Sequence, residues 1–467
     1  MLTVAACDVI AIDEVEPEQS VSPEQALNSV EGFESLLVST YDRLQATGRY
    51  GQVFMLYPDA LADGINVTES SSGRYSDPVS NAQGSHMTTW GGTFSAINET
   101  NLILAQIDGI EIEAPNPEAI QNRIEGEARF LRALNYFDLA RTKGYEPDRE
   151  VDGFNLSVPL RTEPTTGPED ATAIPRATNQ EIYNQVDADL EEAITLLTSA
   201  EEGGEVNNKN FATPEAAHAL RARVALYLED WSTAATQAQN AIDVSGLSLV
   251  SADNFVGAWQ DVTHPESIFE LPMKVGTDGN ATNVNGALDA LTIGDGGQAF
   301  SFEVLPTQDV IDLHEESDVR LDLFAQGVKA GQEVTYLAKY PGAIAPNVDP
   351  IPVIRLAEMY LIRAEALYEQ GDEDGARAAL NTLRDTRNAS EVTASGSDLL
   401  QAILNERRIE LLYEGHRFFD LKRRGLDMPK PQVGRELPDL SYENFRVLSP
   451  IPNLQVIEFG LEQNPGY

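Results

Sequence analysis

The charged residues near the C-terminus are the first candidates for chemistry, because three glutamates recur there at intervals of four residues. The cluster contains Glu406, Glu410, Glu414, Arg407, Arg408 and Arg417. On a helix the glutamates share one face and repel one another unless cations lie nearby. The three arginines are the obvious partners, so the pattern predicts a partly buried ion-pair network that fixes how two segments pack. An acid/base group of Glu414, His416 and Asp420 is the catalytic alternative, which the arginines close to each carboxylate disfavour.

Aromatic residues in polar surroundings are the second candidates. Sugar-binding sites stack sugar faces on aromatic rings and hold the hydroxyl groups with amides, carboxylates and arginines. Tyr75 and Trp259 stand out because their sequence neighbours are polar, although either ring could instead belong to the core. The predicted ligand-binding residues form two walls, Tyr75 with Asp63, Asn66 and Arg74, and Trp259 with Gln260 and Asp261. These walls are far apart in the sequence, so only the fold can bring them together.

Motifs for cofactors, metals and nucleophilic catalysis are missing from the sequence. It has no Gly-rich phosphate loop, no His-Glu-x-x-His, no Gly-x-Ser-x-Gly and no Cys-x-x-Cys, and its five histidines lack metal-ligand spacing. Oxygen ligands for calcium could come from Asp278, Asn280, Thr282 and Asn285, but a plain polar loop explains these residues as well. We therefore expect no cofactor, no metal and no catalytic residue.

The charge balance limits the possible partners. The chain has 467 residues and a formal net charge of −43, which excludes nucleic acid as an expected partner because its phosphates would be repelled. Only 7 of the 32 basic residues are lysine. This composition indicates adaptation to high salt, with an ordinary acidic secreted protein as the alternative. No run of eighteen apolar residues occurs, so we expect no membrane-spanning helix.

The single cysteine lies close to the start of the chain. Cys7 follows the small residues Ala5 and Ala6, as at the cleavage point of a bacterial lipoprotein signal. Six residues precede it, so we interpret residues 1–21 as a truncated lipoprotein signal and tether, with Cys7 as the lipidated residue. A chance cysteine after two alanines is the alternative. A lone cysteine also excludes an internal disulfide.

Helical periodicity organises most of the chain. It predicts helices within residues 22–45, 90–143, 178–245 and 354–425, and loop-rich portions at about 50–89 and 247–351, with a short strand at 267–271. We expect residues 22–467 to form one domain whose first helix is capped by Ser22. Residues 225–234 and 366–376 share the pattern of a tetratricopeptide-like hairpin. The expected core includes Leu131, Leu134, Leu220, Leu361, Ala364 and Leu411.

The C-terminal stretch resembles the signature of the SusD/RagB family. In order, it contains the Glu-Arg-Arg of residues 406–408, the Glu-Gly-His-Arg of 414–417, the Phe-Asp-Leu of 419–421 and a closing Gly425. Further landmarks of the family are residues 126–133, 189–193, 266–269, 318–320, 355–366 and the terminal 464–467. The resemblance therefore covers nearly the whole chain.

The resemblance implies both a fold and a function. The fold would be mostly α, with four tetratricopeptide-like hairpins forming a right-handed scaffold and a loop-rich ligand-binding portion with short strands. The protein would be a glycan-binding lipoprotein of the cell surface, anchored in the outer membrane, that delivers nutrient to a SusC-like TonB-dependent transporter. It would not be an enzyme. The alternatives are a non-glycan nutrient such as peptide, or a glycoside hydrolase, which needs two carboxylates about 5–10 Å apart.

Overall fold

A computed structural model describes most of the chain. It covers residues 27–68, 70–167, 170, 172–273, 287–293, 302–430 and 437–467. The proposed lipidation site Cys7 and the calcium candidates at 278–285 lie outside these ranges.

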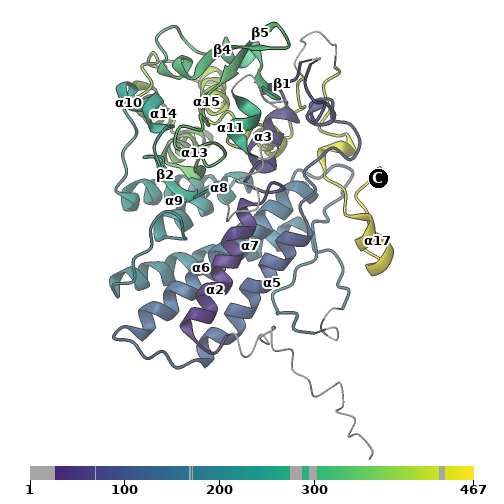
Figure 1. The fold of residues 1–467 in the computed structure, drawn as a ribbon, viewed down its shortest axis with the longest axis vertical. Helices are drawn as coiled ribbons and strands as arrows, with labels where there is room; N and C mark the ends of the chain where they lie inside the picture. Colours follow the sequence, from purple (N-terminus) through teal and green to yellow (C-terminus); the bar gives the residue numbers. More distant parts are fainter. Residues whose placement is uncertain are drawn as a thin grey trace, which may run out of the picture.

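Paired helices build most of the molecule. The main ones are α2 (Val30–Gln45), α5 (Gly91–Gln106), α6 (Pro117–Lys143), α7 (Asn179–Glu202), α8 (Pro214–Tyr227), α9 (Trp231–Ser245), α13 (Leu356–Glu369), α14 (Glu373–Asp385), α15 (Ser397–Glu410) and α16 (Arg417–Arg423). Packing continues from α5 to α6, α7, α8 and α9, and α13 packs on both α9 and α14. Figure 1 shows α2, α5, α6 and α7 in the lower half, with α13, α14 and α15 above them. The predicted mostly α fold of tetratricopeptide-like hairpins is confirmed.

Local capping rules explain where these helices begin. Thr178 and Glu181 form the expected capping box of α7, and Thr213 caps α8 with Pro214 at the first helical position. The first described helix, α2, lies within the predicted helical range 22–45. It begins at Val30, and the Ser29 hydroxyl accepts from the backbone N–H of Gly32 at 3.3 Å. Ser29 directly precedes the buried stripe of this helix and suits the N-cap position, whereas the expected cap Ser22 lies outside the described residues.

Short elements fill the portions expected to be loop-rich. They are α3 (Val53–Ala60), β1 (Ile65–Asn66), α4 (Ser76–Val79), η2 (Ile107–Gly109), α10 (Ala252–Ala258), β2 (Ser267–Leu271), α11 (Leu288–Thr292), β3 (Leu305–Pro306), α12 (Gln308–Ile311), η3 (Val319–Leu323), β4 (Phe324–Lys329), β5 (Gln332–Leu337), β6 (Ile351–Arg355), η4 (Phe445–Val447) and α17 (Asn453–Phe459). The strands pair antiparallel as β1 with β3, β2 with β6 and β4 with β5. The expected strand at 267–271 is thus confirmed.

Helix α3 contradicts the expectation of loops at residues 50–89. It contains Pro58, which signals a turn because proline cannot donate a backbone hydrogen bond. Burial of Phe54, Met55 and Leu56 outweighs this local signal. Gly415 packs directly on the helix: it adopts a φ of 85°, and a Cβ there would lie 2.1 Å from the Phe54 carbonyl oxygen. Only glycine permits this approach between the C-terminal signature and α3.

The core follows the predicted apolar stripes. All six residues expected to be buried are at most 2% exposed: Leu131, Leu134, Leu220, Leu361, Ala364 and Leu411. The core around Leu361 lies among α13, α14 and α15 and is separate from the larger one that includes Leu131. Within the described ranges, no helix combines the length and apolar character needed to cross a bilayer.

Candidate functional site

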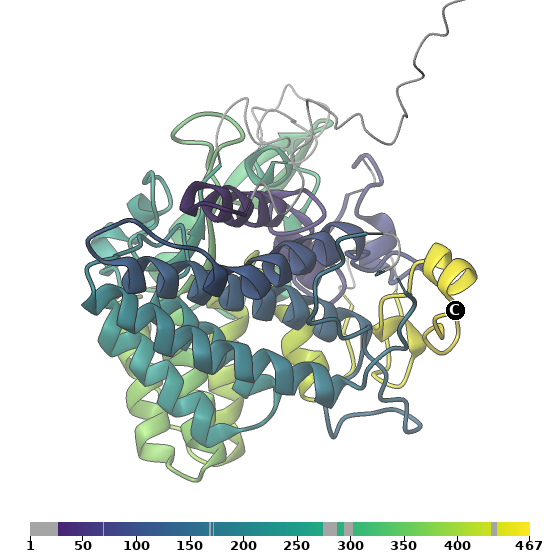
Figure 2. The ribbon, with the colours of Figure 1, turned by 90° about the horizontal axis from the view of Figure 1, so that it is seen from below.

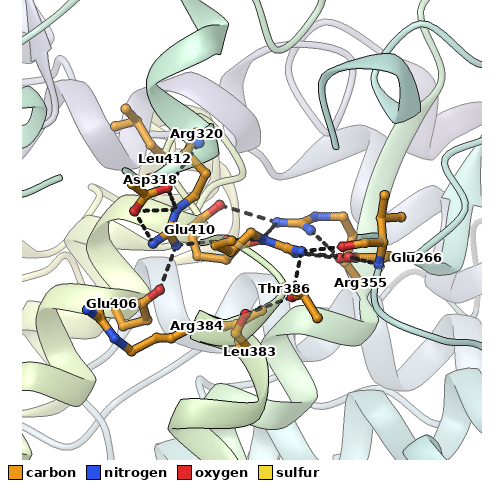
Figure 3. A network of polar contacts seen from close by, with 12 residues as sticks. Glu266, Asp318, Arg320, Arg355, Leu383, Arg384, Thr386, Glu406, Glu410 and Leu412 are labelled. Atoms are coloured by element: carbon orange, nitrogen blue, oxygen red, sulfur yellow. Dashed lines mark hydrogen bonds and ion pairs between the residues drawn. The ribbon is translucent and has the colours of Figure 1, made fainter. Parts of the chain in front are cut away.

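The charged cluster at the end of α15 is buried and paired. Oxygens of Glu410 lie 2.9 Å from the Arg320 guanidinium and 3.0 Å from those of Arg355 and Arg387. Glu266 binds the same two arginines, at 2.8 Å from Arg355 and 2.9 Å from Arg387. Figure 3 shows this arrangement, in which residues from α15, β6 and the turn after α14 converge on Glu410. Burial acts to raise the pKa of Glu410, but Arg387, Arg355 and Arg320 outweigh it and hold the pKa well below its ordinary value.

The partners of the cluster differ from those that the sequence suggested. Glu406 pairs with Arg320 and Arg384, and Glu414 pairs with Lys339 and Arg355. The arginines of the stretch bind elsewhere: Arg407 contacts Asp420 at 3.0 Å, while Arg408 and Arg417 contact Asp63 at 2.9 and 2.7 Å. Expecting the three arginines to neutralise the three glutamates was therefore wrong. Successive residues of a helix point in different directions, so neighbours in sequence reach different partners.

The same contacts leave little room for the acid/base alternative. Asp420 is held by Arg407 and Arg423, each at 3.0 Å. Burial lowers the pKa of His416 well below its ordinary value, so the imidazole is neutral near pH 7. The carboxylates Glu414 and Asp420 are each shared between two cations. The arrangement suits a structural clamp rather than proton transfer.

Neither aromatic ring of the predicted sugar site is open to a ligand. Tyr75 is fully buried and packs edge-on against Tyr57 at 5.6 Å. Trp259 is 5% exposed, with the Lys339 ammonium 4.9 Å and the Arg355 guanidinium 5.2 Å from its ring. The prediction of these two rings as exposed stacking platforms was wrong. The cations of the ion-pair network occupy the surroundings of Trp259, and this cation–π packing explains its burial.

The polar residues predicted around those rings have separate environments. Asp63 is committed to Arg417 and Arg408, which hold its pKa below the ordinary value despite burial. The side-chain oxygen of Asn66 accepts from the backbone of Val67 at 2.9 Å. Gln260 and Asp261 are exposed, and Arg74 is half-buried. Ligand contact at Asn66, Arg74, Gln260 and Asp261 stays a prediction.

Two adjoining cavities meet at Trp90, the N-cap residue of α5, and we call them together the Trp90 groove. The polar chamber, of about 500 Å³, is lined by Arg43, Ala46, Val53, Tyr57 and residues 48–49, 84–86 and 88–93. The apolar chamber, of about 280 Å³, is lined by residues 90–91, Phe94, Pro159, Arg161, Thr165, residues 172–174, Gln455, Phe459 and Leu461. Among the described residues that line the two chambers there is no Asp or Glu, although these residues make up 75 of the 467 in the chain.

Aromatic rings stand along the groove. Trp90 itself is only 9% exposed and packs against Phe94 with ring centroids 4.9 Å apart. Phe459 of α17 is 41% exposed, and none of the residues of α17 is buried. Tyr57 is half-buried on the polar side. Unlike Tyr75 and Trp259, these four rings line a hollow large enough for a sugar unit.

Hydrogen bonds fix both edges of the groove. On the polar side, His86 contacts the Val447 carbonyl at 3.2 Å, and Lys143 donates to Ser449 at 2.6 Å and to the Met87 carbonyl at 3.4 Å. Burial, with Lys143 and Lys422 nearby, lowers the pKa of His86 to about 3, so this wall carries no histidine charge near pH 7. The loop before Thr89 is thereby tied to the C-terminal segment.

On the apolar side, two asparagines of α5 hold the wall. Asn98 exchanges two hydrogen bonds with the backbone of Thr165, at 2.7 and 3.1 Å. Asn101 donates to the Arg161 carbonyl at 3.0 Å, and the Tyr136 hydroxyl donates to the same oxygen at 2.7 Å. Figure 2 shows α17 at the edge of the molecule, beside the long irregular segment between α6 and α7.

The sequence analysis missed this groove because it placed Trp90 inside the predicted helical range 90–143 and sought the ligand site in the loop-rich portions. A signal was present: tryptophan is a poor N-cap, and Trp90 follows a polar loop and precedes Gly91 and Gly92. Phe459 carried a weaker signal, since its helix has no buried stripe. In the part of the chain that the structure describes, no group of three or more His, Cys, Asp or Glu side chains could hold a metal.

Comparison with known protein families assigns the chain. Residues 344–467 match the model of the SusD family, and residues 13–226 match a second model, described as starch-binding and associating with the outer membrane. The chain belongs to the SusD/RagB family. The SusD match contains the Glu406–Glu414 cluster and α17, and the second match contains Trp90 and Arg161.

Individual relatives agree with the family assignment over most of the chain. SusD-like protein P38 of Formosa agariphila is 26% identical, over 88% of this chain and 87% of that protein. The starch-binding protein SusD of Bacteroides thetaiotaomicron is 38% identical over 27% of this chain and 23% of its own length. The crystal structure of a SusD superfamily protein from B. thetaiotaomicron superposes with a TM-score of 0.83 at 25% identity, covering 94% of this chain and 100% of that one.

Proposed function

We propose that this chain is a cell-surface carbohydrate-binding protein that captures glycan in the Trp90 groove without cleaving it. One matching family model is described as starch-binding, and a relative is a starch-binding protein, which supports carbohydrate as the ligand class. The proposal moves the binding site away from Tyr75 and Trp259.

The observation that carries the proposal is the composition of the groove. Its aromatic rings offer apolar faces, while Thr88, Gln455 and the backbone N–H groups of Gly91 and Gly92 offer partners for hydroxyl groups. A glycoside hydrolase needs two carboxyl groups that flank the scissile bond. The described residues of the lining include neither Asp nor Glu, so they suit holding a sugar and not hydrolysing it.

The expected setting is the outer membrane. We propose that lipidated Cys7 anchors the protein there and that it delivers glycan to a SusC-like TonB-dependent transporter. The description of the second family model, which mentions association with the outer membrane, and the small residues before Cys7 support this setting. Cys7→Ser should release the protein from the membrane fraction, since the acyl chains supply the anchoring free energy. Retention of the variant in membranes would contradict lipidation at Cys7.

Calorimetry with a panel of oligosaccharides tests the binding site. Phe459→Ala should weaken binding about tenfold, because it removes an exposed stacking face. Ile457→Ala is the matched control: it lies on the same short helix, is 80% exposed and does not line the groove. Both variants should melt like the parent, since α17 has no buried residue. Equal affinities of the parent and Phe459→Ala for every oligosaccharide that binds would contradict the site.

A further inference from the structure

The charge of the Trp90 groove is opposite to that of the rest of the chain. The protein carries a formal net charge of −43, yet the charged residues among the described lining of the groove are Arg43, Arg49 and Arg161. We propose that the groove takes an anionic carbohydrate, with a carboxylate or sulfate group of the sugar bound by Arg161. This inference rests on the proposed function of the groove and names its ligand class.

Arg161 differs from the other two arginines in its partners. Arg43 is neutralised by Glu99 at 2.6 Å and Arg49 by Asp138 at 2.8 Å. The guanidinium of Arg161 donates only to backbone carbonyls, those of Asp170 at 3.2 Å and Thr172 at 2.6 Å. No described carboxylate lies within ion-pair distance of it. Among the described residues its charge therefore has no carboxylate partner, which makes it available to a ligand.

Asp170 interacts electrostatically with Arg161, but the two side chains make no ion-pair contact. Hydrogen bonds from Thr166, and then the charge of Arg161, are among the causes that lower the pKa of the Asp170 carboxyl group. The carboxylate of Asp170 accepts from the backbone N–H of Thr166 at 3.2 Å and from its hydroxyl at 2.7 Å. Asp170 thus shapes the loop that carries Arg161 while its backbone carbonyl orients the guanidinium. The carboxylate itself forms no ion pair with Arg161.

Hydrogen bonds to neighbouring side chains fix the backbone of Arg161. Its carbonyl accepts from Asn101 and Tyr136, and its own N–H donates to the Tyr136 hydroxyl at 2.8 Å. The side chain lines the apolar chamber beside Phe94 and Phe459. Apolar surroundings strengthen a charge-assisted hydrogen bond, because they screen it less than water does. A planar guanidinium also matches the paired oxygens of a carboxylate or sulfate.

The N-terminus of helix α5 is a second feature of the Trp90 groove that attracts an anion. This helix has 16 residues, and no side chain caps its N-terminus. Gly91 and Gly92 are exposed, and a Cβ on either would meet no atom within 4 Å. The positive end of the helix dipole therefore lies beside Trp90, with no glycine side chain to cover it, and it favours an anion.

The lack of carboxylates is the independent argument for an anionic ligand. Asp and Glu are common acceptors for the hydroxyl groups of neutral sugars, so a site for neutral glycan has no physical reason to avoid them. A negatively charged ligand would be repelled by every carboxylate in the lining, and more strongly in an apolar hollow than at the surface. The acid-free lining is the arrangement expected if such a ligand must enter a strongly acidic protein.

The experiment compares three oligosaccharides of equal length by titration calorimetry: a neutral one, a polyuronate with carboxylates and a sulfated one. At low salt we expect at least one anionic oligosaccharide to bind at least about tenfold more tightly than the neutral one, and its affinity to fall as salt is added. The uronate and sulfate arms distinguish the two anionic groups. Equal or tighter binding of the neutral oligosaccharide would overturn the inference.

Substitutions of Arg161 test whether this residue causes the preference for anionic oligosaccharides. Arg161→Gln should weaken binding of the anionic oligosaccharide by about tenfold or more and reduce its salt dependence, while Arg161→Lys, which keeps the charge, should retain part of the affinity. Arg363→Gln is the control. It changes the net charge equally, on α13 and outside the groove, and should leave the affinity unchanged. An equal loss in Arg161→Gln and Arg363→Gln would show a general charge effect and overturn the assignment.

The two levels of the proposal fail in different ways. If Phe459→Ala weakens binding but Arg161→Gln has no effect on any anionic oligosaccharide, the groove binds carbohydrate and the anionic inference is wrong. If Phe459→Ala affects none of the three oligosaccharides, the groove itself is wrong.

Discussion

The cluster around Glu410 and the Trp90 groove use arginine in opposite ways. Around Glu410, buried arginines and glutamates alternate so closely that each carboxylate contacts two or three cations. Among the described residues that line the groove there is no Asp or Glu, and the Arg161 guanidinium donates only to carbonyl oxygens. The difference teaches that a dense charged motif can be wholly structural. Binding capacity lies where polar groups and rings are left without protein partners.

The largest effect should come from breaking the cluster. Glu410→Gln removes the negative charge shared by Arg320, Arg355 and Arg387 and leaves buried cations uncompensated, which should cost about 3–5 kcal/mol of unfolding free energy. Denaturant unfolding measures the loss. Glu229→Gln is the control, because its ion pair with Arg149 is 38% exposed and should contribute less than about 1 kcal/mol. Equal costs for the two variants would mean that the cluster does not stabilise the fold.

A core substitution separates stability from binding. Leu361→Ala leaves a cavity in the core of α13, α14 and α15 and should cost about 2–5 kcal/mol. It touches neither the ion pairs of Glu410 nor the groove. Chemical unfolding should register the loss, while calorimetry at a temperature where the protein stays folded should give the parental carbohydrate affinity. A matching loss of affinity would show that the two regions are not independent.

The pH dependence of stability distinguishes the two regions by their titrating groups. The folded pKa of His86 is about 3, below its unfolded value of about 6.5. As the pH falls from about 6.5 towards 3, the unfolded chain gains a proton that folded His86 does not bind. Stability should therefore fall by up to about 1.4 kcal/mol per pH unit from this residue.

Glu410 behaves differently, because its folded pKa is depressed. Its contribution is present above its unfolded pKa of about 4.3 and is lost only as the pH falls from there through the folded pKa. Unfolding free energies measured from pH 7 to 5 should thus fall less steeply in His86→Gln than in the parent. An unchanged slope would mean that His86 is protonated in the folded protein.

The helices and the core could be read from the sequence because their causes are local. The capping box of Thr178 and Glu181, four residues long, predicts the start of α7. The spacing of Leu131 and Leu134 predicts the buried face of α6. The SusD/RagB resemblance, carried by residues 406–425, supplied the architecture that periodicity alone could not.

The site could not be read in this way, because its causes are contacts between distant segments. Polar neighbours in sequence suggested that Trp259 is exposed, but Lys339 and Arg355 enclose it. From the sequence, Trp90 belongs to a helix. Only the fold brings the segment with Arg161 and the C-terminal helix with Phe459 around the same cavity as Trp90. Likewise, the glutamates of the cluster were recognised from their spacing, whereas their partner Arg387 comes from the turn after α14.

The location of bound carbohydrate is the central claim, and a crystal structure of the protein with an oligosaccharide that binds in calorimetry tests it most directly. The account predicts a sugar ring against Phe94 or Phe459 beside Trp90, with an anionic substituent within hydrogen-bond distance of the Arg161 guanidinium. Sugar bound at Gln260 and Asp261, or anywhere else outside the Trp90 groove, with the groove empty would contradict it.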